Sequence, residues 1–112
     1  MSAKILVIDD EAAIRDMMRM ILEYEGHEVL LAGSGQEGLQ VAQAESPDLV
    51  FLDIKMPGMD GLEVLTRLRA TSESLPVVIV SAHGTATTAL EAGRLGAYRF
   101  IEKPLSKDYI ID

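Results

Sequence analysis

Short apolar runs alternate along the chain with longer stretches in which apolar residues recur every three or four positions. The short runs predict buried strands, and the three-to-four spacing predicts amphipathic helices. The first helix, for example, opens at Glu11 and ends where Gly26 can form a left-handed cap. We predict strands at 4–8, 28–32, 49–52, 77–80 and 98–102, and helices after Glu11, Ser34, Asp60, the turn at 83–85 and Ser106.

Two of these helices carry a recognisable N-terminal signal. Ser34 and Glu37 have the S-x-x-E spacing of a capping box, in which each side chain bonds the backbone of the other residue. Asp60 and Glu63 have the same spacing. The sequence therefore predicts that helices begin directly after Ser34 and Asp60.

The alternation of strand and helix occurs five times and indicates a parallel sheet with right-handed crossovers and helices on both faces. The predicted class is α/β, doubly wound, with residues 1–112 forming one domain. The last helix reaches Asp112 after barely two turns, which is short for a stable helix. We therefore expect that the chain is cut within this helix and that the natural protein continues.

Composition and net charge limit the kinds of partner and location that fit the chain. The chain has 18 acidic and 10 basic residues, a net charge of −8, which disfavours direct binding to nucleic acid or to an anionic membrane. It has no cysteine, no signal-like N-terminus and no apolar run of membrane-spanning length. We expect a cytoplasmic domain with no membrane partner and with a cationic ligand.

Polar residues follow four of the predicted strands at the point where each ends. Asp9 and Asp10 follow the first strand, Asp53 the third, Ser81 the fourth and Lys103 the fifth. The carboxyl ends of parallel strands share one edge of the sheet, where ligands bind in folds of this class. If the strand order is 2-1-3-4-5, the first and third strands are neighbours where the crevice opens, and we expect these five side chains to converge.

These residue types suit a phosphoryl group and a hard metal ion. Three carboxylates in one cleft repel each other unless a cation neutralises them. Mg²⁺ takes oxygen ligands and keeps several waters, so one or two carboxylates and a backbone carbonyl suffice. Lys103 and Ser81 offer a positive charge and a hydroxyl donor, and Asp53 can act as a nucleophile toward phosphorus.

The motifs Asp9-Asp10, Asp53 with the loop MPGMDG, Ser81-Ala82 and Lys103-Pro104 resemble those of response regulator receiver domains, in order and spacing, over essentially the whole chain. The resemblance implies a flavodoxin-like sheet of order 2-1-3-4-5 and Asp53 as the phospho-acceptor. It also implies a Mg²⁺ site formed by Asp10, Asp53 and the main-chain carbonyl of Lys55, with Asp9 contributing through water.

The resemblance assigns further roles. Ser81 and Lys103 would bind the phosphoryl oxygens, and Phe100 would turn inward as part of the switch. The Lys103–Pro104 bond would be cis. Lys55 and His83 occupy positions that tune dephosphorylation in the family.

The partners implied are a sensor histidine kinase or a phosphotransfer protein, and a homodimer is one outcome of phosphorylation in the family. Output would pass through the surface of the fourth helix, fifth strand and fifth helix. Residues 83–105 most resemble receivers fused to an AAA+ ATPase that activates sigma-54-dependent transcription. We therefore expect an output domain beyond Asp112, and a signalling domain rather than an enzyme, one that promotes its own phosphorylation and dephosphorylation.

Simpler interpretations of the same residues stay open. Asp9 and Asp10 could be helix-capping acids, since carboxylates stabilise helix N-termini in any protein. Ser81 could be a turn residue, Lys103 a solvated charge and Phe100 a core residue. Lys55 and His83 could be loop residues without a role.

Three other functions fit the sequence less well. A haloacid dehalogenase-type phosphatase expects a second Asp two residues after the nucleophile, and position 55 is Lys. A flavodoxin needs a hydroxyl- and glycine-rich phosphate loop after the first strand, where Asp-Asp-Glu stands instead. A receiver-like interaction module that is never phosphorylated usually lacks a key acid or the lysine, and all are present here.

Overall fold

Five parallel strands form a single sheet in the order β2-β1-β3-β4-β5. The computed structural model describes residues 2–54, 56, 58–72, 74–81, 90 and 93–102, with the backbone alone at 81 and 99–102. The predicted α/β class and strand order are confirmed. The elements are β1 (Lys4–Ile8), α1 (Ala12–Tyr24), β2 (Glu28–Ala32), α2 (Gly35–Glu45), β3 (Leu49–Asp53), α3 (Gly61–Thr71), β4 (Val77–Ser81) and β5 (Arg99–Glu102).

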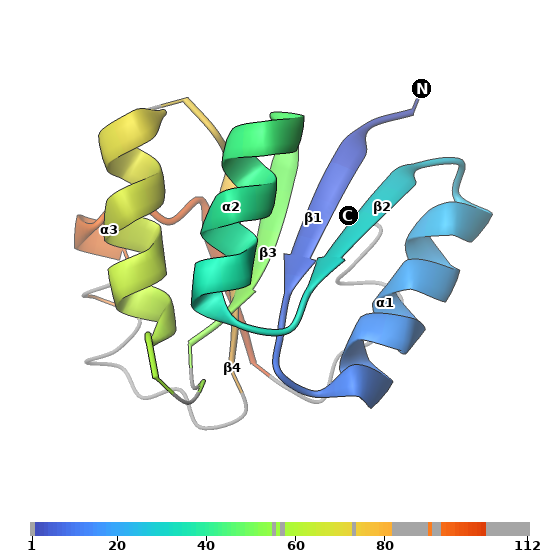
Figure 1. Ribbon diagram of the computed structural model, residues 1–112, viewed down its shortest axis with the longest axis horizontal. Helices are drawn as coiled ribbons and strands as arrows, with labels where there is room; N and C mark the ends of the chain where they lie inside the picture. Colours follow the sequence, from blue (N-terminus) through green and yellow to red (C-terminus); the bar gives the residue numbers. More distant parts are fainter. Residues whose placement is uncertain are drawn as a thin grey trace.

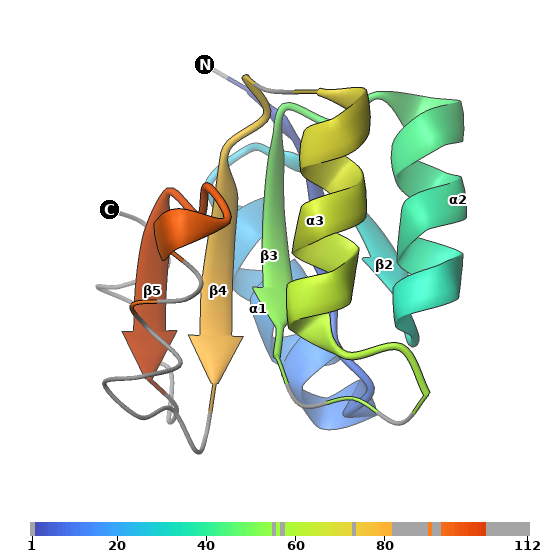
Figure 2. The same ribbon diagram turned by 90° about the vertical axis from the view of Figure 1, so that its left-hand side faces the viewer.

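Each face of the sheet carries its own apolar layer. Helices α2 and α3 lie side by side over one face (Figures 1 and 2), and α1 packs on the other through Met18 and Leu22. Alternate residues of a strand point to opposite faces, so neighbouring residues enter different layers. The sheet residues facing α2 and α3 are Leu6, Ile8, Val50, Leu52, Val77 and Ile79, and those facing α1 are Ile5, Val7, Phe51, Val78 and Val80.

The predicted helix caps are present, with one difference. Ser34 Oγ accepts a hydrogen bond from the Glu37 N–H at 3.1 Å, and Asp60 accepts one from the Glu63 N–H at 3.0 Å. The Glu37 carboxylate, however, accepts from the Gly33 N–H at 2.8 Å. A capping box requires the N–H of Ser34 itself, so this reciprocal half of the prediction was wrong by one residue.

The other element boundaries agree closely with the sequence. Gly26 has φ +91°, as the left-handed cap requires. Strand β3 extends one residue beyond the apolar run, because Asp53 still pairs in register with Val80. Strand β5 begins at Arg99, although the Tyr98 N–H donates to the Val77 carbonyl at 2.8 Å. By these bounds Asp53 is the last residue of β3, and Tyr98 lies just before β5.

Arg69 joins the end of α3 to the segments that lead into the last two strands. Its guanidinium donates to the carbonyl of Ser72 at 2.8 Å and to that of Leu75. Its Nε donates to the Gly96 carbonyl at 3.1 Å, 27 residues further along the chain. One side chain thus bonds the segments that lead into both β4 and β5.

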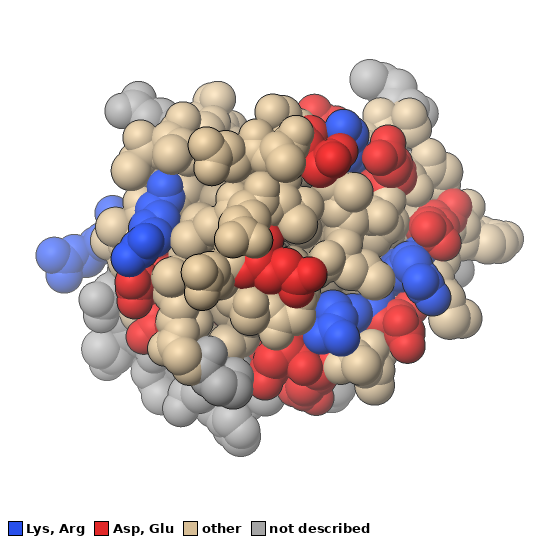
Figure 3. Space-filling model, viewed as in Figure 1, with Lys and Arg blue, Asp and Glu red and all other residues tan. Residues whose placement is uncertain are grey.

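Surface charge is dispersed on the side of the molecule seen in Figure 1. Acidic side chains form several small groups there, with basic side chains among them (Figure 3). Among the described residues, no helix is both long and apolar enough to cross a bilayer.

Candidate functional site

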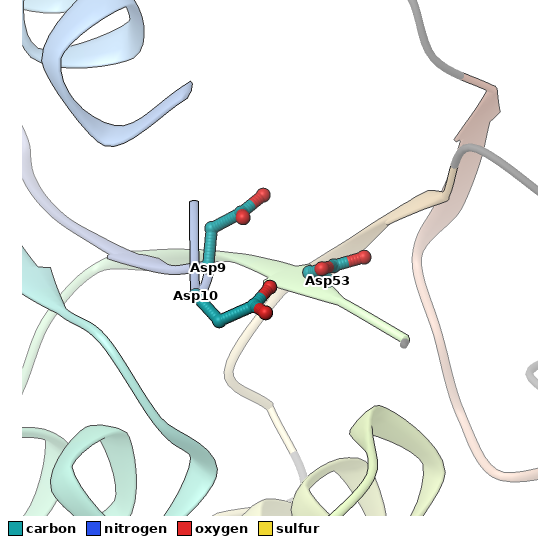
Figure 4. Close-up of side chains that lie close together, drawn as sticks. All are labelled: Asp9, Asp10 and Asp53. Atoms are coloured by element: carbon teal, nitrogen blue, oxygen red, sulfur yellow. The ribbon is translucent and has the colours of Figure 1, made fainter. Parts of the chain in front are cut away.

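Three aspartates meet where β1 and β3 end. The two strands are neighbours in the sheet, with Ile8 opposite Leu52. Oxygens of Asp9, Asp10 and Asp53 all lie within 4.8 Å of one another (Figure 4). Asp9 and Asp53 are 2% and 3% exposed, whereas Asp10 is open to solvent. The prediction that these three acids lie close together is thus confirmed.

Asp9 is held at three points. Its N–H donates to the Ala32 carbonyl at 3.1 Å, and its Oδ1 accepts from the Glu11 N–H at 2.9 Å. Its carbonyl oxygen accepts from Arg15 Nη1 at 2.7 Å. The bond from the Glu11 N–H is not a helix-capping bond, because Glu11 is the N-cap residue of α1 and its N–H precedes the first turn of the helix. The same carboxylate also lines the acidic cluster.

The backbone after Asp53 is held by the start of α3. The Gly61 N–H donates to the Ile54 carbonyl at 2.8 Å, and the Ile54 N–H donates to the Val80 carbonyl at 3.3 Å. A Cβ built on Gly61 would lie 2.5 Å from Ile54 Cα and against the Asp53 carbonyl oxygen. Only glycine leaves room for this close approach.

The remaining predicted site residues belong to β4, β5 and the segments after them. Ser81 ends β4 and lies in register with Glu102, while Phe100 lies opposite Ile79. The backbone register thus brings Ser81 beside the residue that precedes Lys103. The side chains of Ser81 and Phe100 lie outside the described part of the chain, as do Lys55, His83, Lys103, Pro104 and the helix predicted after Ser106, so their roles stay predictions.

The donor set fits a hard divalent cation. Two oxygens bound to one Mg²⁺ lie about 3–4 Å apart, because each bond is about 2.1 Å. The oxygens of the cluster lie within 4.8 Å of one another, so small rotations of the side chains, or one bridging water, would bring them to that geometry. Among the described residues, no histidine joins this group of acids. Oxygen ligands alone favour Mg²⁺ over softer metals.

Two residues near the cluster were not singled out from the sequence. Arg15 is the fourth residue of α1, where the helix dipole disfavours a cation, and that unfavourable position was the available signal. Gly61 follows the cap residue Asp60, and glycine is a weak helix former. Its presence inside the first turn indicates a close packing contact.

Known proteins resemble this chain over its full length. The family model for the response regulator receiver domain matches residues 5–112. Sporulation initiation phosphotransferase F of Bacillus subtilis is 38% identical over 112 residues, covering 100% of this chain and 90% of the relative. Response regulator MprA of Mycolicibacterium vanbaalenii is 35% identical over 111 residues, covering 99% of this chain and 48% of the relative.

The solved structure of NtrX from Brucella abortus superposes with a TM-score of 0.93 at 46% identity, covering 99% of this chain and 26% of that one. The chain thus spans about half of MprA and about a quarter of NtrX.

Proposed function

This chain belongs to the response regulator receiver domain family, and from that premise we propose that Asp53 accepts a phosphoryl group with Mg²⁺ bound beside it. Receiver domains are signalling domains of two-component systems, and they generally bind Mg²⁺ at an acidic pocket. The observation that carries the proposal is the cluster of Asp9, Asp10 and Asp53 at the carboxyl edge of the sheet.

The donor would be the phosphohistidine of a sensor histidine kinase or of a phosphotransfer protein. In the transfer, the P–N bond of the phosphohistidine breaks, a P–O bond to an Asp53 carboxylate oxygen forms, and the leaving imidazole takes up one proton from solvent, which gives a neutral histidine and an aspartyl phosphate. Such transfers depend mainly on positioning and on charge neutralisation. Asp53 is held for this role because its own backbone is in β3 and the following residue is bonded by α3 and β4.

Mg²⁺ would be held by Asp10, Asp53 and the main-chain carbonyl of Lys55, and when bound it would neutralise charge on the phosphoryl oxygens. Asp9 would contribute through water, because one of its oxygens already accepts the Glu11 N–H. Asp10 is exposed, so its carboxylate is free to turn toward the ion. The proposed division between direct and water-mediated ligands therefore follows the bond made by Asp9 and the exposure of Asp10.

We propose that Ser81 and Lys103 bind the phosphoryl oxygens and that Phe100 changes position with them. The pairing of Ser81 with Glu102 supports this, since it sets the end of β4 beside the approach to Lys103. A cis Lys103–Pro104 bond, and tuning of dephosphorylation by Lys55 and His83, complete the proposal.

The output is proposed from the longer relatives. NtrX has been solved with ADP and with ATP, and this chain matches only 26% of its length. We propose that a further domain follows this one, that it acts in transcription regulation in the cytoplasm, and that the surface of the fourth helix, β5 and the fifth helix controls it. The Bacillus relative, whose name records phosphotransfer, supports a second output, passage of the phosphoryl group to another protein.

The test is the intact mass of the protein after incubation with a small phosphodonor, with and without Mg²⁺. We expect a gain of one phosphoryl group that requires Mg²⁺. If Mg²⁺ binds in a separate titration and no gain follows, the chain is instead a receiver-like interaction module that works without phosphorylation.

Replacing Asp10 by Asn should weaken Mg²⁺ binding by at least about 10-fold, since a charged ligand becomes neutral. The fold should be unaffected because Asp10 is exposed. Calorimetric titration with MgCl₂ measures the change. Asp16→Asn removes the same charge from an exposed site on α1, and a similar loss there would show that the effect is one of net charge only.

A further inference from the structure

Arg15 connects α1 to the peptide that joins two of the clustered acids. Its Nη1 donates to the Asp9 carbonyl oxygen at 2.7 Å, a short bond for an N–H donor. That carbonyl belongs to the peptide between Asp9 and Asp10. The plane of this peptide decides the direction in which Asp10 leaves the chain.

The tip of Arg15 is confined from the other side by the turn that follows β2. A Cβ built on Gly33 would lie 3.2 Å from Arg15 Nη1 and 3.7 Å from Glu37 Oε1. The guanidinium therefore packs directly over the Gly33 backbone. Since the Gly33 N–H donates to that same Glu37 oxygen at 2.8 Å, the turn beneath Arg15 is itself fixed.

These contacts tie three segments together at the site. The Asp9 N–H bonds the Ala32 carbonyl, which sets the end of β1 against the end of β2. Arg15 then bridges the Asp9–Asp10 peptide, just beyond β1, and the turn at Gly33. The Ile8–Asp9 peptide is thereby bonded to a neighbouring strand, and the Asp9–Asp10 peptide that follows it is bonded to a helix residue.

We propose that Arg15 is a positioning residue for the metal site, which orients the Asp9–Asp10 peptide so that the Asp10 carboxylate is held toward Mg²⁺. This inference rests on the proposed function, because it concerns the same site. Groups that orient metal ligands commonly change metal affinity by about 10-fold or more when removed.

Charge and position make opposite predictions for this residue. A guanidinium near the carboxylates repels a divalent cation, so loss of its charge alone would tighten Mg²⁺ binding. Loss of the bond to Asp9 frees the Asp9–Asp10 peptide and would weaken Mg²⁺ binding. The sign of the change in the dissociation constant therefore separates the two effects.

The experiment titrates the full chain with MgCl₂ alone, by calorimetry, in the parent and in Arg15→Ala and Arg15→Lys. We expect binding about 10-fold weaker in Arg15→Ala and partial recovery in Arg15→Lys, which keeps a donor of similar reach. Arg19→Ala is the matched control, since it removes the same charge one turn further along α1, where the side chain pairs with exposed Asp16. It should leave Mg²⁺ binding unchanged or slightly tighter.

A second variant perturbs Arg15 without changing it. The methyl group of Gly33→Ala would push against the guanidinium. Mg²⁺ binding should weaken, though less than in Arg15→Ala, and Gly33→Ala should have no further effect in a chain that already carries Arg15→Ala. Without Mg²⁺, the amide NMR resonance of Asp10 should shift in all Arg15 variants, because its peptide loses the bond at Asp9.

The outcomes separate this inference from the proposed function. If the parent chain does not bind Mg²⁺, the proposed metal site fails and the inference fails with it. If the parent binds, Asp10→Asn weakens binding and Arg15→Ala leaves it equal or tighter, only the inference is overturned. Should Arg15→Ala not fold, the same decision rests on Arg15→Lys and Gly33→Ala.

Discussion

Asp53→Asn should remain folded and should gain no phosphoryl group under conditions in which the parent chain is fully modified. The amide has nearly the same shape as the carboxylate but does not attack phosphorus. Asp53 is 3% exposed and lies within 4.8 Å of two other acids, so loss of its charge relieves repulsion. We therefore expect the thermal unfolding midpoint in Mg²⁺-free buffer to be no lower than that of the parent. Intact mass and thermal unfolding measure the two expectations.

Asp60→Asn provides the control for this substitution. Asp60 is exposed and caps α3, and Asn caps a helix about as well as Asp. This variant should be phosphorylated like the parent. Undiminished uptake by Asp53→Asn would place the modified residue elsewhere and would remove Asp53 as the acceptor.

Gly61→Ala should strongly destabilise the fold beside the site. The new Cβ would lie 2.5 Å from Ile54 Cα, and this neighbour is backbone, which cannot rotate away. Overpacking of this kind costs about 3 kcal/mol, which for a domain of this size lowers the unfolding midpoint by about 10 °C or more. The adjustment would also move the peptide after Asp53, so the folded fraction should bind Mg²⁺ more weakly. Thermal unfolding followed by circular dichroism measures the first effect.

Gly93→Ala is the matched control for Gly61→Ala. A Cβ there meets no atom within 4 Å, and the residue is helical, so alanine should leave stability unchanged or raise it by up to about 1 kcal/mol. A midpoint for Gly61→Ala within about 2 °C of the parent would mean that α3 moves away from β3 at little cost.

Local patterns were enough to predict the strands and the helix starts. The apolar runs at 4–8 and 28–32 are strands with the bounds that were predicted, because hydrophobic burial in a parallel sheet leaves little choice of register. The meeting of Asp9, Asp10 and Asp53 was predicted from the position of each acid at a strand end together with the strand order that makes the first and third strands neighbours. The strand order itself came from the family resemblance and not from the patterns.

Contacts between distant segments could not be predicted in this way. The bonds of Arg69 to the carbonyls of Ser72, Leu75 and Gly96 depend on where the loops pass the end of α3. The bond of Arg15 to the Asp9 carbonyl and the bond of Glu37 to Gly33 depend on backbone directions at two turns. Hydrophobic period carries no information about which carbonyl a flexible cationic side chain will reach.

The two apolar layers of the sheet bear on how such a domain diversifies. Val7 and Ile8 are adjacent in β1, yet one packs under α1 and the other under α2 and α3. Substitutions in separate layers have few shared contacts, so their effects on stability should add. Residues of the layer under α1 can therefore change their packing without compensating changes under α2 and α3, while the shared backbone of β1 and β3 keeps the three acids in place.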